Sequence, residues 1–290
     1  MTWQVIDLNY ISCQIPAMSE KSNFMDICPK RVGAQLRILR KQAGLSQLDL
    51  ALITGISQRH LSCIETGKAK PSTGTLHALL SALDAPLEQS NSIFLAAGYA
   101  PRYAASTLTA PSMEMVRGAI NHLLQTQNPA PAFALGSNWE VLAANAGTKA
   151  LRGLIGLPPE LPEGANLLEM LLLPGGLGDH LNNRDEITSI AWQRAAREAL
   201  TNSFLATLLE GLPMPASSPA LAPNLPPLVL IRVESSQGEL RFLSTFTTFG
   251  MPLDITVASL RIDHLIPADP NTWKVMTTAC EGMPHASRDK

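Results

Sequence analysis

The chain has 290 residues, which predicts about two domains at roughly 150 residues each. Hydrophobic residues make up 46% and charged residues 16%, so there is enough apolar material for packed cores, and disorder of the whole chain is excluded. The formal net charge of −2 excludes a uniformly basic nucleic-acid-binding surface but allows a local basic patch. The four cysteines lie far apart with no C-x-x-C pair, which excludes a zinc ribbon and a disulfide-dense scaffold.

No targeting signal is expected in the N-terminal segment. Residues 1–27 show no clean helical or strand period, so we expect a disordered tail there. They lack the basic leading region of a signal peptide, and the chain has no run of 18 apolar residues. We therefore expect a cytoplasmic protein without a membrane segment.

Charge is distributed unevenly along the chain. Residues 30–72 hold eight basic and two acidic residues, a net charge of +6. The remainder then carries 14 basic and 22 acidic residues, a net charge of −8. A basic module attached to an acidic body indicates a polyanionic partner for the module alone.

Five short helices are predicted over residues 30–97, within a first domain at residues 28–100. Gly44 is placed as the C-cap glycine of the first helix. Ser46, with Asp49 three residues later, forms a capping-box pattern that begins the second helix.

Residues 45–67 meet the requirements of a helix-turn-helix together. Two helices that pack at a steep angle need a small residue at their closest approach, which Ala51 supplies. The turn needs a residue that tolerates positive φ, which Gly55 supplies. The apolar residues required between the helices are Leu50, Ile56, Leu61 and Ile64.

The third predicted helix, residues 57–65, presents polar side chains opposite this apolar face. Such a helix can lie in the major groove, where Gln pairs with adenine and Arg with guanine, each pair discriminating by about 1–3 kcal/mol. A small helical bundle with a solvated polar face is the alternative, but the turn glycine, the apolar offsets and the basic charge coincide and favour DNA. Gln58, Arg59 and Ser62 are candidates for base contacts, and Gln47, Arg40, Lys41, Lys68 and Lys70 for phosphate contacts.

The stretch GAQLRILRKQAGLSQLDLALITGISQRHLSCIETGKAKPSTGTLHALLSAL resembles the Xre/Cro-type helix-turn-helix of phage repressors and many bacterial regulators. The resemblance covers about residues 31–97 and rests on LR-x-x-R-x-x-x-GLSQ, G-I-S and IETGK-x-x-PS. It implies a five-helix module whose recognition helix is Ser57 to Glu65. The positions that match family DNA contacts are Gln47, Ser57, Gln58, Arg59 and Ser62.

A linker at residues 101–112 leads to a second domain at residues 113–275. Early strands, central helices and late strands predict an α+β domain with an antiparallel sheet. In chain order, the predicted elements are helix 113–125, strands 132–135 and 140–144, helices 145–153 and 184–210, and strands 228–234, 239–249 and 255–265.

Some local features of this domain are also predicted. Asn145 is placed as the N-cap of the short helix. The apolar parity shifts between Val257 and Leu260, which indicates a bulge in the last strand. Residues 213–227 contain six prolines and are expected to form a loop. We expect residues 276–290 to be a flexible tail.

The segments PAFALGSNWEVLAANAGTKAL, AWQRAAREAL, ELRFLSTFTTFG and DITVASLRIDHLIP together resemble the MmyB-like ligand-binding domain. The resemblance implies a PAS-like fold behind this same helix-turn-helix, a small apolar ligand such as a fatty acid, and a regulator of nearby genes. The proline-rich insert departs from the family pattern. Aromatic side chains at strand positions are candidate ligand contacts, although packing in the core is the favoured interpretation. They are Phe133, Trp139, Phe242 and Phe246.

The sequence thus predicts a mixed α and α+β chain, with an N-terminal five-helix DNA-binding bundle and a PAS-like domain. We expect a homodimeric transcription regulator that binds double-stranded DNA at an inverted-repeat operator, because one short helix reads too few base pairs. Catalytic residues, metal ligands and cofactors are not predicted. Two alternatives stay open: a repressor or antitoxin-like regulator whose second domain binds a protein partner, and an enzyme with an appended helix-turn-helix.

Overall fold

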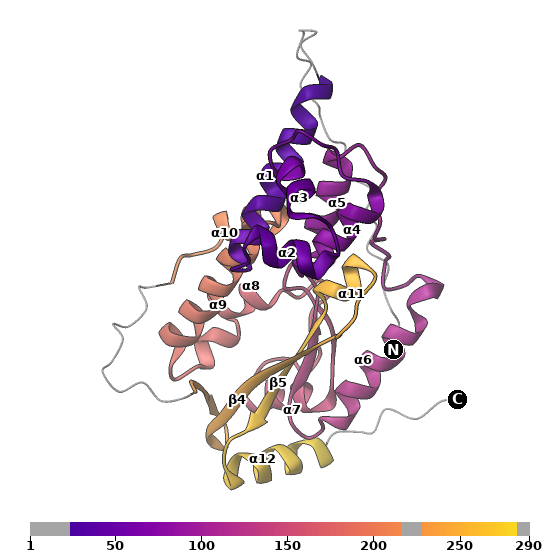
Figure 1. Ribbon diagram of the computed structural model, residues 1–290. Helices are drawn as coiled ribbons and strands as arrows, with labels where there is room; N and C mark the ends of the chain where they lie inside the picture. The colour runs from indigo at the N-terminus through magenta and orange to yellow at the C-terminus, as the bar shows by residue number, and fades with distance from the viewer. Residues whose placement is uncertain (1–23, 216–227, 283–290) are drawn as a thin grey trace. The chain divides into compact units, whose positions relative to one another are not determined.

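The computed structural model describes residues 24–215 and 228–282, and the chain divides into two compact units (Figure 1). We call them the helical unit, up to residue 109 together with 253–255, and the sheet unit, which holds the rest. The expected N-terminal tail falls mostly outside the described residues. Its last four positions, 24–27, begin the first helix, so the tail prediction was wrong there.

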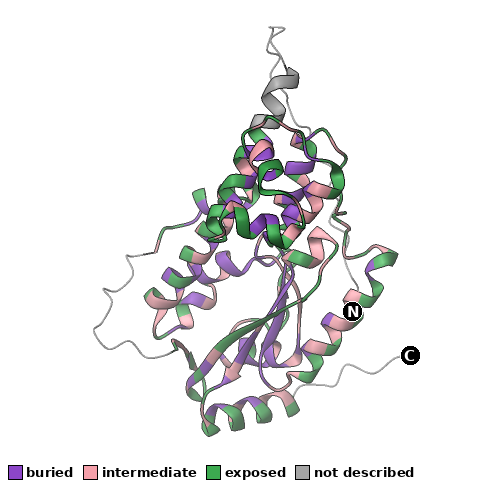
Figure 2. Cartoon of the chain, viewed as in Figure 1, coloured by how far each residue is buried: buried purple, intermediate pink, exposed green. Residues whose placement is uncertain are grey.

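The helical unit contains the five helices that the glycine punctuation predicts. Their apolar faces meet in a single core, and Figure 2 shows buried positions where the helices face one another. The helices are α1 (Phe24–Gln42), α2 (Gln47–Thr54), α3 (Gln58–Glu65), α4 (Thr73–Ala82) and α5 (Leu87–Ala96).

Local sequence fixes the ends of α2 as predicted. The Ser46 side chain accepts a hydrogen bond from the Asp49 amide, and the Asp49 side chain accepts one from the Ser46 amide, which completes the capping box. Gly55 ends α2 at φ +71°.

Gly33 is a second small residue that the sequence analysis missed. A Cβ atom at Gly33 would lie 2.3 Å from the backbone oxygen of Ile64, so α1 and α3 approach each other more closely than any side chain allows. Gly33 therefore allows α3 to pack closely against α1.

The sheet unit is built on a five-stranded sheet in the order β2-β1-β5-β4-β3, with antiparallel pairing between all neighbours. The antiparallel α+β prediction is confirmed. The last strand, β5, lies between the early strand β1 and the late strand β4, and therefore joins the β1–β2 pair and the β3–β4 pair into one sheet. The strands are β1 (Ala132–Leu135), β2 (Val141–Ala144), β3 (Leu230–Ser235), β4 (Gly238–Thr248) and β5 (Arg261–Pro267).

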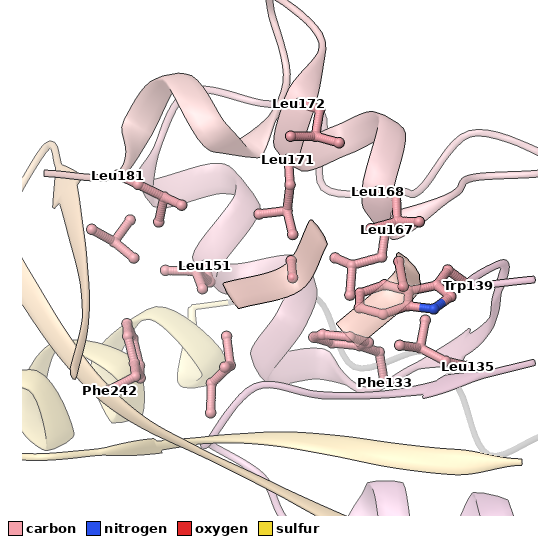
Figure 3. Packing of buried hydrophobic residues seen from close by; sticks show 14 of the residues in the cluster. Phe133, Leu135, Trp139, Leu151, Leu167, Leu168, Leu171, Leu172, Leu181 and Phe242 are labelled. Atoms are coloured by element: carbon pink, nitrogen blue, oxygen red, sulfur yellow. The ribbon is translucent and has the colours of Figure 1, made fainter. Parts of the chain in front are cut away.

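Helices α7 to α10 pack on one face of this sheet and form the main core with it. Figure 3 shows Phe133 and Trp139 facing the leucines of α8. Helix α6 packs against β1, and α12 contacts α7 and the two longest strands. The helices are α6 (Glu114–Thr126), α7 (Ala146–Leu154), α8 (Leu167–Leu172), α9 (Arg184–Ala199), α10 (Ser203–Glu210), α11 (Ile255–Ser259) and α12 (Pro270–Glu281), with short 3₁₀ turns η1 (Pro111–Met113) and η2 (Leu177–His180).

Three predictions about this unit were wrong. The long helix at 184–210 is two helices, because Asn202 caps α10 by accepting a hydrogen bond from the Leu205 amide at 3.1 Å. The shift of parity at 255–265 marks a change from helix α11 to strand β5 and not a bulge. The expected C-terminal tail begins inside α12, where Met276 is fully buried. Most of the proline-rich loop, residues 216–227, lies outside the described residues.

Candidate nucleic-acid interface and ligand pocket

Helix α3 has one buried and one exposed face. Leu61 and Ile64 are fully buried in the core of the helical unit. Gln58 and Arg59 are exposed, and Ser62 is half-buried. Ser57 is the N-cap, and its side chain accepts a hydrogen bond from the His60 amide at 3.2 Å. The cap therefore fixes the first residue of α3, and the helix presents hydrogen-bond donors and acceptors on the side opposite Leu61 and Ile64.

A buried ion pair locks α3 to the helix that precedes the helix-turn-helix. The Arg40 Nε donates to Glu65 Oε1 at 2.6 Å, and its Nη2 donates to Oε2 at 3.0 Å. The Arg40 Nη1 donates to the Leu45 carbonyl at 2.7 Å. Both side chains are less than a tenth exposed. The expected phosphate contact of Arg40 is therefore corrected, because its guanidinium is already occupied inside the unit.

Gln47 belongs to the same cluster. Its Nε2 donates to Glu65 Oε2 at 2.8 Å, and the side chain is half-buried. Glu65 thus joins α1, α2 and α3 through three hydrogen bonds. Glu65 was not predicted as a functional residue. It could have been found because it is one of only two acidic residues at positions 30–72 and because it follows the apolar Ile64.

The Glu65 carboxylate stays ionised in this environment. Burial by itself raises its pKa, but hydrogen bonds from Arg40 and Gln47, with the charges of Arg40 and Arg37, lower the pKa below its ordinary value overall. The cluster therefore holds two opposite full charges, and its geometry depends on both.

The predicted lysines are exposed. Lys68 and Lys70 lie in the segment directly after α3, and Lys41 lies at the end of α1. The Lys70 Nζ also lies 4.6 Å from the centre of the Tyr99 ring. These cations are available to a polyanion.

The sheet unit contains a small apolar cavity between β1, β2, β5 and the helices α7 and α8. Its volume is about 30 Å³, which admits only water-sized contents. Its walls are apolar apart from Thr148 and Arg152. The lining includes Phe133, Val141, Leu151, Leu167, Met170 and Leu265.

The four predicted ligand residues occupy different environments. Phe133 lines the cavity. Trp139 and Phe242 are buried in the core, and the Trp139 Nε1 donates to Glu198 Oε2 at 2.7 Å. Phe246 is 56% exposed and lies under the guanidinium of Arg194. The structure thus brings one of the four to the cavity wall.

Asn145 has the structural role that the sequence predicts. Its Oδ1 accepts hydrogen bonds from the amides of Thr148 and Ala132, both at 2.9 Å. Its Nδ2 donates to the carbonyls of Leu124 and Ala130. Asn145 caps α7 and ties it to β1 and α6.

The comparisons with known proteins cover both units. Residues 116–278 match the model of the MmyB-like transcription regulator ligand binding domain. Residues 31–92 match a helix-turn-helix domain model. An uncharacterized HTH-type transcriptional regulator, y4dJ of Sinorhizobium fredii, is 39% identical over 54 residues, which span 19% of this chain and 70% of that protein.

Two solved structures each match less than a quarter of this chain. The restriction-modification controller protein C.AhdI of Aeromonas hydrophila is 31% identical with a TM-score of 0.21, and the match covers 22% of this chain and 94% of that one. The clp gene regulator ClgR of C. glutamicum is 30% identical with a TM-score of 0.22, and covers 24% and 88%. Among the residues that the structure describes, no helix is both long and apolar enough to cross a bilayer.

Proposed function

This chain belongs to the MmyB-like transcription regulators, and on that premise we propose that it binds a specific DNA sequence through α3 and that a ligand in the sheet unit changes this binding. The observation that supports the DNA contact is the exposed pair Gln58 and Arg59 opposite the fully buried Leu61 and Ile64. A helix held this way can insert its polar face into the major groove.

The contacts divide into two classes. Gln58 and Arg59 read base edges, since their side chains offer bidentate donors and acceptors. Phosphate contacts fix the position of the unit on the duplex and make affinity sensitive to salt. We assign Ser62 to the base edges with Gln58 and Arg59, and we assign the phosphate contacts to Gln47, Ser57, Lys41, Lys68 and Lys70. For Gln47 the contact comes from the amide at the start of α2, because its side chain already binds Glu65.

Specificity calls for two copies of the recognition helix. One helix of this length reads only a few base pairs, whereas a homodimer on an inverted repeat reads two half-sites. The half-sites would lie about one helical turn, roughly 34–36 Å, apart or at a multiple of that distance.

The ligand of the sheet unit is proposed to be a small molecule with an apolar body, such as a fatty acid. The cavity at Phe133 is apolar but has a volume of only about 30 Å³, so an acyl chain enters only if neighbouring side chains move. Contacts from Trp139, Phe242 and Phe246 to the ligand require the cavity to enlarge further along the sheet. The ligand would bind the sheet unit with an open cavity more tightly than the unit with a closed cavity. This difference in affinity couples ligand binding to DNA binding if the two states also differ in their affinity for DNA.

Native mass spectrometry of the purified full chain tests the ligand proposal. The native spectrum should show a dimer that carries an acyl-sized molecule. The denatured spectrum should show the protein without that molecule. A dimer without any adduct, which copurifies with another protein, would instead support a sheet unit that binds a protein partner.

A further inference from the structure

The outer edge of strand β4 is open along its second half. Strand β3 pairs with β4 only as far as Leu243, whereas β5 pairs with β4 from Phe242 to Thr248. Residues 244–248 therefore have a neighbouring strand on one side only. All five are exposed, and Figure 2 shows this part of β4 as an exposed strip that runs toward α11. Among the residues that the structure describes, none pairs with the outer side of this segment.

The alternation of the strand decides which main-chain groups point to the open side. Successive residues of an antiparallel strand direct their N–H and C=O groups to opposite neighbours. The Arg241 carbonyl accepts a hydrogen bond from the Ala268 amide, directly after β5, at 2.8 Å. The odd-numbered residues of β4 therefore face β5, and Ser244, Phe246 and Thr248 direct both main-chain groups to the open edge.

The other edges of the sheet are occupied by neighbouring segments of the chain. At β3, the Asn182 amide donates to the Arg232 carbonyl at 2.8 Å, and the Arg232 side chain adds an exposed charge. At β2, the Val141 amide donates to the Ala165 carbonyl at 2.8 Å. Such covering and charge are common ways in which proteins prevent pairing between strand edges. Among the described residues, the edge at 244–248 has neither protection.

The residues that precede β3 are chemically unsuited to pair with this edge. Continuing the register backwards from the pair Leu230–Leu243 would set Pro227 opposite Phe246. Proline has no N–H, so it cannot donate to the outward carbonyl of Phe246. The edge is therefore suited to a strand from another molecule.

We propose that a second copy of this chain pairs with the open edge of β4, antiparallel and two-fold symmetric about Phe246. The inference rests on the homodimer of the proposed function and gives that dimer an interface. In this arrangement Phe246 lies opposite its own counterpart, and Ser244 lies opposite Thr248 of the second copy. Each of these outward-facing pairs exchanges both main-chain hydrogen bonds.

The side chains favour a second copy over an unrelated strand. The segment Ser-Thr-Phe-Thr-Thr reads nearly the same in both directions, so two copies set hydroxyl opposite hydroxyl and ring opposite ring. Cross-strand pairs of these kinds stabilise antiparallel pairing, and the segment holds no charge that would oppose a like charge. The Phe246 ring is 56% exposed, and its centre lies 4.6 Å from the Arg194 guanidinium, whose charge Glu198 balances at 3.0 Å. The ring is therefore already held beside the edge.

Analytical ultracentrifugation of the full chain without DNA tests the interface. The double variant Ser244→Pro with Thr248→Pro removes two outward N–H groups and none that bonds to β5, so the sheet unit should stay folded. Ser244→Ala with Thr248→Ala is the matched control, because it keeps both N–H groups. The wild type and the alanine variant should dimerise alike, and the proline variant should raise the dimer Kd by about tenfold or more with little change in melting temperature.

A disulfide provides a second measurement that does not depend on proline. In Phe246→Cys, the two thiols face each other across a pair whose Cα atoms lie about 5.5 Å apart, which is within reach of a disulfide. Mild oxidation should give a covalent dimer, and mass spectrometry of its peptides should identify the link between the two positions 246. Thr245→Cys is the control and should cross-link much less, because its counterpart lies diagonally across the axis.

A dimer that the proline variant leaves as tight as the alanine control would overturn the β4 interface while the homodimer stands. A Phe246→Cys dimer that forms no disulfide at position 246 would do the same, and this result decides the question if the proline variant unfolds. A wild-type chain that stays monomeric at all concentrations would reject the homodimer and its interface together, and would leave the edge to the strand of a different protein.

Discussion

Removal of the Glu65 carboxylate should destabilise the helical unit more than removal of any exposed acid. In Glu65→Ala, Arg40 stays buried without its counterion and Gln47 loses its acceptor. Breaking a buried pair from one side costs about 3–5 kcal/mol of unfolding free energy. A unit of this size has a stability of roughly 4–13 kcal/mol, so the loss is a large fraction of the whole. At about 4–8 °C per kcal/mol, its melting temperature should fall by roughly 12–40 °C.

Hydrogen exchange of α1 and α3 peptides during urea unfolding of the full chain measures this effect in the helical unit alone. Glu88→Ala is the control, because it removes an exposed acid from the same unit and should change stability by less than about 0.5 kcal/mol. The double variant Arg40→Met with Glu65→Leu should recover most of the loss, since an apolar pair replaces the ion pair. A loss in Glu65→Ala no larger than in Glu88→Ala would refute the reasoning.

Four further outcomes are expected. Arg59→Ala should weaken specific DNA binding by about 1–3 kcal/mol per half-site without a change in melting temperature, measured by fluorescence anisotropy; unchanged affinity would remove Arg59 from the interface. Gly33→Ala should cost about 1–3 kcal/mol of stability, because its Cβ meets the Ile64 carbonyl; a neutral result in urea unfolding would contradict that contact. Since the folded pKa of Glu65 is lowered, its contribution to stability is present above its ordinary pKa of 4.5 and is lost as the pH falls through the folded pKa; a unit equally stable at pH 6 and pH 3 would argue against it. Asn145→Ala should cost the sheet unit about 2 kcal/mol or more, since it leaves buried amides and carbonyls unpaired.

The elements that the sequence predicts well are those with local causes. The capping box at Ser46, the turn at Gly55 and the cap at Asn145 each depend on residues within three positions, and all three are confirmed. Strand β1 agrees to the residue because a short apolar run is bounded by proline and glycine.

The features that the sequence did not predict depend on contacts between distant residues. Arg40 looked like a surface cation in the sequence, and its partner Glu65 lies 25 positions away. The close approach at Gly33 is likewise visible only once α3 lies against α1. Arg152 lies in the last turn of a helix, where basic residues are common. Nothing in the neighbouring sequence therefore indicated that its side chain is buried in the apolar cavity wall. The break between α9 and α10 was missed because the apolar face continues across it.

Selection of bound sequences from a random duplex DNA library tests the central claim most directly. The full chain should enrich an inverted repeat, and the variant Gln58→Ala with Arg59→Ala should enrich none while it keeps salt-sensitive, non-specific binding. A wild-type chain that enriches no sequence, or a variant that enriches the same repeat, would contradict recognition through α3.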